Sequence, residues 1–113
     1  MRKSKISISG FKIGTAENRE GLTGVTVILA PDGGATAGVD VRGCAPGTRE
    51  TDLLDPRKTV QKIHAVVLSG GSAFGLEAAS GCVKYLAEQG VGFPIGNVCV
   101  PIVCSAVLFD DWR

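Results

Sequence analysis

The sequence predicts a single α/β domain, and three observations carry this prediction. Its 113 residues are close to the usual size of one domain and too few for two. The first third contains short runs of alternating polar and apolar residues, which are typical of half-buried strands. Residues 63–68 form a nearly unbroken apolar strand that leads through a glycine-rich junction into a helix.

The charge and hydropathy patterns exclude several classes of protein. Twelve basic and 11 acidic residues give a net charge of +1, so no general electrostatic field attracts nucleic acid or anionic lipid. No apolar run reaches the ~18 residues that a membrane helix needs. Residues 1–5 are charged, but no apolar segment of a signal peptide follows them. We therefore expect a soluble, cytoplasmic protein with no nucleic-acid partner and no membrane contact.

The N-terminal third is expected to form an antiparallel meander of short strands. Alternation of polar and apolar residues and β-branched runs indicate the strands, and an Asp-Gly pair indicates a hairpin turn. The expected elements are strands at residues 5–9, 11–13, 25–29 and 36–42, a loop at 15–21 and a turn at 31–34.

Residues 43–55 lack any periodic pattern, and irregular stretches of this length are usually functional or disordered. Their charged side chains, including Arg49 and Glu50, either form a local ion-pair network or are simply solvated. Asp55 followed by Pro56 is typical of a helix start, with Asp as the N-cap, so a short helix is expected there.

A longer helix is expected after the apolar strand and to extend to about Gln89. Gly90 is a natural stop for this helix. A turn-rich crossover should follow at residues 91–96, and then an apolar strand region at 98–109 that Pro101 interrupts. Residues 106–110 resemble a buried strand that is either an edge strand or part of a longer polypeptide. One stripe of the helix is apolar, formed by Leu76, Ala79, Val83 and Leu86.

The glycine-rich junction at residues 69–75 is the strongest local signal for a binding site. Its spacing fails the phosphate-loop pattern, the dinucleotide fingerprint and the nucleophile elbow. Two interpretations remain open. The backbone N–H groups at the start of the helix could bind a carboxylate or an oxyanion. Alternatively, the glycines serve only tight packing of the strand against the helix.

His64 and the four cysteines are the other residues with reactive side chains. His64 lies in the apolar strand without an acidic neighbour, which favours a core histidine over a catalytic base. The cysteines lack the spacing of a zinc site and are expected to be reduced thiols in the core, so no metal is expected. The four are Cys44, Cys82, Cys99 and Cys104.

Five sequence blocks, taken together, carry a family resemblance. They closely resemble the N-terminal part of the L-aminopeptidase/D-esterase (DmpA-type) peptidase family, self-processing hydrolases related in fold to ornithine acetyltransferase. The resemblance extends from about Ile6 to Asp110. The blocks are residues 39–43, 45–56, 64–76, 100–103 and 106–110.

This resemblance implies a four-layer α/β/β/α sandwich, of which residues 1–113 would be one domain or an N-terminal fragment. It implies a precursor that cleaves itself, so that a Ser or Thr becomes the N-terminal nucleophile of the second chain; its own α-amine can then act as the base. That nucleophile lies in the C-terminal part of the family, so no catalytic residue is expected in this chain, and Ser72 is not the nucleophile. The resemblance places Gly70, Gly71, Ser72, Ala73 and Phe74 in the wall of the substrate pocket.

Two departures from the family pattern stand out. Some relatives carry Tyr where this chain has Phe74, and the family usually has an apolar residue at the position of Asp111. The C-terminal Asp111, Trp112 and Arg113 therefore resemble a truncated or frameshifted end.

The expected function is that of the N-terminal portion of a self-cleaving aminopeptidase, amidase or esterase. The alternative is a non-catalytic binding or assembly module that keeps the scaffold. No cofactor is expected. The expected partners are a peptide or aminoacyl amide or ester substrate, the C-terminal chain of the same precursor, and further copies of the chain in a homo-oligomer, because an unfinished sheet exposes an edge.

Overall fold

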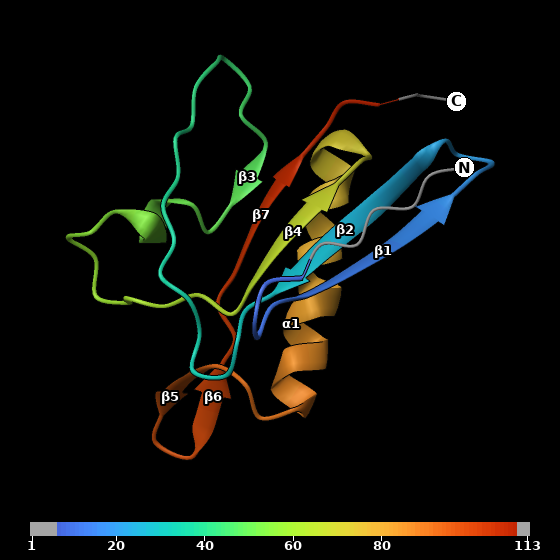
Figure 1. Ribbon diagram of the computed structural model, residues 1–113. Helices are drawn as coiled ribbons and strands as arrows, with labels where there is room; N and C mark the ends of the chain where they lie inside the picture. The colour runs from blue at the N-terminus through green and yellow to red at the C-terminus, as the bar shows by residue number, and fades with distance from the viewer. Residues whose placement is uncertain (1–6, 111–113) are drawn as a thin grey trace.

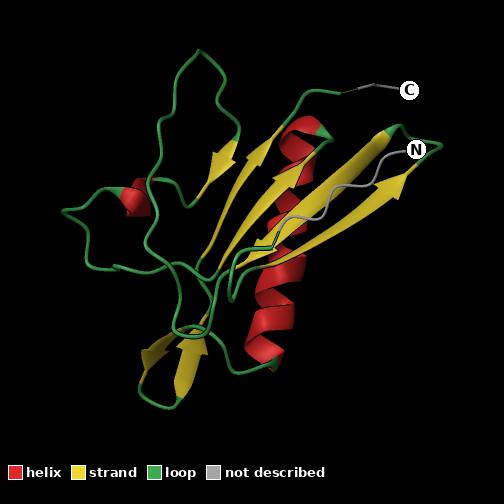
Figure 2. Ribbon diagram, viewed as in Figure 1, coloured by secondary structure: helices red, strands yellow, loops and turns green. Residues whose placement is uncertain are grey.

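A five-stranded mixed sheet forms the centre of the molecule in the computed structural model, which describes residues 7–110 (Figures 1 and 2). The strand order is β1-β2-β4-β7-β3, and a separate antiparallel hairpin is formed by β5 and β6. The strands are β1 (Lys12–Asn18), β2 (Thr23–Leu29), β3 (Thr48–Arg49), β4 (Ala65–Ser69), β5 (Phe93–Ile95), β6 (Val98–Val100) and β7 (Val103–Val107). The helices are two 3₁₀ segments, η1 (Asp52–Leu54) and η2 (Ser72–Glu77), and the α-helix α1 (Ala78–Glu88).

The first two strands form a hairpin in which Lys12 is paired with Leu29 and Asn18 with Thr23. The strand predicted at residues 25–29 is confirmed, but the loop predicted at 15–21 is wrong because residues 15–18 continue β1. Their polar sequence suits an edge strand, and all of β1 is exposed. The strand predicted at residues 5–9 is not formed by Ser7, Ile8 or Ser9, and its first two residues lie outside the described part.

The centre of the fold is a β-α-β unit made by β4, η2 with α1, and β7. Strands β4 and β7 are parallel neighbours, from the pair Ala65 and Val103 to the pair Ser69 and Val107. Parallel neighbours need a crossover connection, and the helix supplies it. The apolar strand, the helix that follows it and the stop at Gly90 are therefore confirmed, with Gly90 at φ 70° and the Val91 N–H bonded to the Leu86 carbonyl at 3.0 Å.

The main core lies between α1 and one face of the sheet, and Figure 1 shows the helix behind the strands. Alternation along β4 directs Ala65, Val67 and Ser69 toward the helix and leaves Leu68 on the other face. Small side chains on the helix allow it to lie close to the sheet. The buried apolar residues of this core are Ala65, Val67, Ala79, Cys82, Leu86 and Val103.

The second face of the sheet is only partly covered. Ile63, Ile102 and Cys104 are buried there under the long segment that includes Leu53 and Leu54. Further along this face Leu68 is 47% exposed, although it lies in a central strand. An apolar residue of a central strand that stays half in water marks a surface with room for another layer.

Two elements predicted before the apolar strand are not formed. Residues 36–42 make no strand, and a single bridge between Ala35 and Ile63 follows the turn at 31–34. No helix begins at Asp55; instead its carboxylate accepts hydrogen bonds from the side chain and backbone N–H of Arg57, which lower the pKa of Asp55 to about 2. A local turn therefore satisfies the side chain that was expected to cap a helix.

The strand predicted at residues 106–110 ends earlier, at Val107. Leu108 is 71% and Phe109 78% exposed, so they are not core residues, and β7 lies between β4 and β3 rather than at an edge. The C-terminal Asp111, Trp112 and Arg113 lie outside the described residues. The described part is thus a mixed α/β arrangement of one helix layer on one sheet, and its helices are too short to cross a membrane.

Candidate functional site

The topology brings three chain segments together at one end of the sheet. The parallel strands β4 and β7 both end there, and β2, which is antiparallel to β4, begins there at Thr23. The glycine-rich residues 70–74, called the glycine loop below, follow β4, while Leu108 and Asp110 follow β7. The carboxyl ends of parallel strands are where open α/β sheets usually bind ligands.

A carboxylate joins these three segments. Asp110 Oδ2 accepts a hydrogen bond from the hydroxyl of Thr23 at 2.6 Å, and its Oδ1 accepts one from the backbone N–H of Gly71 at 3.0 Å. These two bonds hold the pKa of Asp110 below its usual range, because both donors favour the charged carboxylate. Asp110 is therefore ionised at neutral pH and bound on both of its oxygens.

Gly70 in the glycine loop and Gly75 just after it are packed so closely that neither has room for a side chain. A Cβ on Gly70 would overlap the carboxylate of Asp110 and the hydroxyl of Thr23, and a Cβ on Gly75 would overlap the carbonyl of Gly70. Gly71 adopts φ 88° and Ser72 φ 54°, a left-handed conformation that is strained for a serine. Gly70 and Gly75 thus pack tightly against neighbouring atoms, as the packing interpretation expects.

The first three N–H groups of the loop are all bonded inside the protein. Gly70 donates to the carbonyl of Gly24 at 2.9 Å, Gly71 to Asp110, and Ser72 to the carbonyl of Leu108 at 2.9 Å. The carboxylate at the start of the helix is the protein's own Asp110, which occupies an N–H group that the other interpretation assigned to a ligand. These three N–H groups are thus not free for an anionic ligand.

Two grooves flank the glycine loop. The larger, about 660 Å³, lies between Leu22, Leu68, Leu108 and Asp110. The smaller, about 360 Å³, lies toward the helix. Gly70 lines both grooves, and Gly71 and Phe74 line the smaller one, whereas Ser72 and Ala73 line neither of the two. Phe74 is 76% exposed at the rim.

Ser72 and His64, which could in principle form a nucleophile and a base, are far apart. His64 precedes β4 and Ser72 follows it, and a five-residue strand is about 16 Å long. His64 is 5% exposed, and its Nδ1 accepts the N–H of Ile102 at 3.1 Å. Burial lowers the pKa of His64, so the ring is neutral and fixes the start of β7. The prediction of a core histidine is confirmed.

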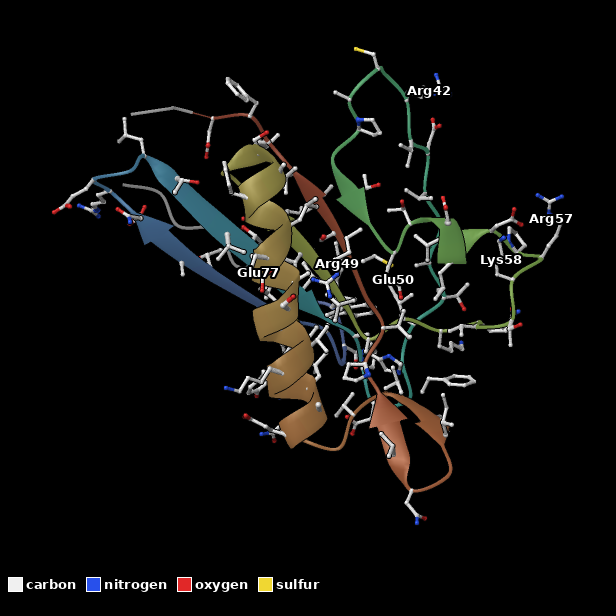
Figure 3. The ribbon with its side chains drawn as sticks, turned by 180° about the vertical axis from the view of Figure 1, so that it is seen from behind. Arg42, Arg49, Glu50, Arg57, Lys58 and Glu77 are labelled. Atoms are coloured by element: carbon white, nitrogen blue, oxygen red, sulfur yellow. The ribbon has the colours of Figure 1, made fainter. Side chains whose placement is uncertain are left out.

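Arg49 stabilises the contact between β3 and the helix. Its guanidinium donates to the Ser80 hydroxyl at 2.7 Å and to the carbonyl of Leu76 at 3.4 Å (Figure 3). Of the two alternatives for the charges of this segment, the ion-pair network is not formed by Arg49 or Glu50, since the ion pairs found within residues 7–110 do not include either of them. Arg57 and Lys58 lie in the loop that follows η1 and extend away from α1 (Figure 3).

The cysteines divide between the core and the surface. Cys82 and Cys104 are buried thiols, as expected, and burial raises the pKa of both. The expectation is wrong for Cys44, which is exposed, and Cys99 is only partly buried. Across residues 7–110, no group of three or more His, Cys, Asp or Glu side chains is placed to hold a metal ion.

Sequence reasoning did not single out Thr23 or Asp110 as site residues. They are 87 positions apart, and no short pattern links a threonine at the start of one strand to an aspartate after another. The glycines at residues 70–75 were the feature of the sequence that indicated close packing at this place. Two residues lie so close to Gly70 that a side chain there would overlap them, but the sequence alone does not indicate which residues these are.

Comparison with known proteins identifies the family. The sequence pattern of peptidase family S58 matches residues 6–113, and the chain belongs to this family. The predicted resemblance to an aminopeptidase family is thereby confirmed at the level of the family.

Three curated relatives have the names of aminopeptidases or of an endohydrolase. An uncharacterized aminopeptidase of Mycobacterium tuberculosis is 54% identical over 87 residues, which are 77% of this chain and 25% of that protein. A protein of Mycobacterium leprae with the same description is also 54% identical, over 77% of this chain and 24% of the relative. A 6-aminohexanoate-oligomer endohydrolase of Paenarthrobacter ureafaciens is 37% identical over 94% of this chain and 27% of that protein. The chain spans about a quarter of the length of these curated relatives.

Proposed function

We propose that this chain is the N-terminal portion of a self-cleaving aminopeptidase, amidase or esterase. In this proposal it supplies one helix layer, one sheet and a wall of the substrate pocket. The Ser or Thr nucleophile comes from polypeptide outside these 113 residues, and the chain alone has no turnover. The observation that carries the proposal is the match to a peptidase family over residues 6–113 by a chain about a quarter as long as its relatives.

The uncovered sheet face supports the first part of the proposal. Leu68 in the central strand β4 is 47% exposed, and Leu108 beside it on the larger groove is 71% exposed. A second sheet packed on this face would bury both residues and complete the four-layer sandwich. Burial of apolar area at ~25 cal/mol per Å² would drive that assembly.

The glycine loop supports the second part. Gly70 lines both grooves and Phe74 is exposed at the rim of the smaller one, which suits a pocket wall rather than a reacting group. Ser72 has no imidazole nearby, because β4 separates it from His64, the only histidine of the sequence. The reacting hydroxyl is therefore expected elsewhere.

The names of the relatives suggest the substrates to test. Aminopeptidase relatives point to N-terminal aminoacyl amides or esters, and the endohydrolase relatives point to amides of a linear ω-amino acid. Both classes share a carbonyl bonded to a leaving amine or alcohol, so one nucleophilic hydroxyl can attack either.

Co-expression tests the proposal. The chain is produced together with the C-terminal segment of a family S58 relative, and hydrolysis of an aminoacyl-p-nitroanilide and of a 6-aminohexanoate oligomer is measured. We expect hydrolysis by the mixture and none by either part alone, and light scattering should find both parts in one complex that contains several copies of each.

The matched control replaces the N-terminal Ser or Thr of the C-terminal segment with Ala, which should abolish turnover without preventing assembly. Hydrolysis by the 113-residue chain alone, retained after Ser72→Ala, would refute the placement of the nucleophile. A stable chain that never assembles with the segment would favour the non-catalytic module instead.

A further inference from the structure

The side chain of Asp110 bonds to the backbone of the glycine loop from a distant segment of the chain. Its two oxygens reach across 87 residues to Thr23 and across 39 residues to Gly71. Each bond is made by a charged acceptor, and such bonds are shorter and stronger than neutral ones. Asp110 thus connects the start of β2 to the loop that follows β4.

The backbone of the glycine loop is strained at Ser72, next to the bond from Gly71 to Asp110. Gly71 and Ser72 both have positive φ angles, and a serine in this region adopts it only when its surroundings impose it. The N–H of Ser72 is held by the carbonyl of Leu108, two residues before Asp110. The segment after β7 therefore holds two consecutive N–H groups of the loop.

We propose that Asp110 is a positioning residue for the substrate pocket, whose carboxylate holds the glycine loop in the conformation that binds substrate. The role in substrate binding rests on the proposed function, whereas the positioning of the loop rests on the two hydrogen bonds of Asp110. Without the carboxylate the loop samples other conformations. Apparent affinity then falls in proportion to the fraction of molecules whose loop is in place.

The first test measures positioning without any catalysis. Amide hydrogen exchange at Gly71 is followed by NMR in the ¹⁵N-labelled chain for Asp110→Ala, Asp110→Asn and Thr23→Val. We expect exchange at Gly71 to be at least about tenfold faster in Asp110→Ala. Asp110→Asn should show a smaller increase because an amide oxygen can still accept the Gly71 N–H, and so should Thr23→Val, which keeps the carboxylate.

The matched control is Asp40→Ala, which removes an exposed carboxylate whose ion pair is with Arg42 at 2.8 Å. Exchange at Gly71 should be unchanged in this variant. Equal exchange rates in Asp110→Ala and Asp40→Ala would overturn the proposal. If Asp110→Ala does not fold, Asp110→Asn and Thr23→Val still decide the question, because both preserve the shape of the side chain.

The second test uses the co-expressed hydrolase. Asp110→Ala should raise KM about tenfold and change kcat less than twofold, and Asp110→Asn should restore part of the affinity. A merely structural role would lower thermal stability and the active fraction while leaving KM unchanged, and that result would overturn the role in the pocket. Failure of every variant and the parent to hydrolyse substrate would refute the proposed function, whereas the exchange result would still decide whether Asp110 positions the loop.

Discussion

Two glycines of the chain, Gly70 and Gly81, differ in the space that surrounds them for a side chain. Gly70 faces Thr23 and Asp110 at a distance that leaves no space for a methyl group, whereas a Cβ on Gly81, on the outer side of α1, meets no atom within 4 Å. Composition alone makes them look equal, because both are glycines in or near a helix. Only the three-dimensional environment separates a required glycine from one that merely lowers helix propensity.

Substitution by alanine should therefore have opposite effects at these two positions. Gly70→Ala should destabilise the chain by about 1–3 kcal/mol because the methyl group displaces the Asp110 carboxylate. Gly81→Ala should stabilise it by up to about 1 kcal/mol through helix propensity. Urea denaturation of both variants and the parent provides the free energies of unfolding, and a stabilised Gly70→Ala would contradict the packing described.

His64 gives the stability of the chain a pH dependence that can be assigned to one residue. Burial lowers the pKa of His64 in the folded state below its usual 6.5, and protonation of Nδ1 would also break its bond to the Ile102 N–H. The unfolded chain therefore binds more protons just below pH 6.5. The stability from His64 is fully present above pH 6.5 and is lost as the pH falls toward the folded-state value.

We expect the urea midpoint to be level from pH 8 to about 6.5 and to decrease from there to pH 5.5. This window lies above the pKa values of ordinary carboxyl groups and below those of the buried thiols, which burial raises further. His64→Gln removes the chain's only histidine and should remove the slope. A slope that persists in His64→Gln would contradict the assignment.

At the scale of elements, the best predictions concern segments whose pattern is local and strong. The apolar strand β4, the helix with its stop at Gly90 and the β-branched strand β2 formed as expected. The strand expected at residues 36–42 did not form, although its alternation resembles that of β1. Strand formation requires a partner, and β2 found its partners in β1 and β4.

Asp55 caps no helix because a nearby residue supplies other hydrogen-bond donors for its carboxylate. Its carboxylate was recognised as a hydrogen-bond acceptor, but two residues later Arg57 supplied both a backbone and a side-chain donor. Aspartate in such a turn competes with helix formation. The sequence indicated that the Asp55 carboxylate accepts hydrogen bonds. The donors of Arg57 determined that these bonds form a turn and not a helix cap.

Within the described residues, the five-stranded sheet has one covered face and one partly covered face. Helix α1 covers the first, and the segment around Leu53 and Leu54 covers only part of the second. Because Leu68 is half in water, its replacement by a charged residue removes little that stabilises this chain by itself. The same charge would become buried if another layer packed there, and an unpaired buried charge is costly.

Leu68→Lys should thus lower the free energy of unfolding of the 113-residue chain by no more than about 1.5 kcal/mol, because only half of the side chain is buried. It should nevertheless prevent assembly and hydrolysis with the C-terminal segment. Ile95→Lys is the matched control, since Ile95 is 59% exposed on the separate β5-β6 hairpin. Assembly is measured by light scattering, and normal assembly by Leu68→Lys would contradict a second layer on this face.

The sequence by itself determined the family, the apolar strand β4 and the helix that follows it, because these depend on local periodicity and on residue types in consecutive order. The tertiary structure decided the rest: which strands pair, which face stays open, and that Thr23 and Asp110 hold the glycine loop. These features join residues far apart in the chain, and their free energy depends on distances that exist only after folding. The order of residues along the chain does not specify those distances.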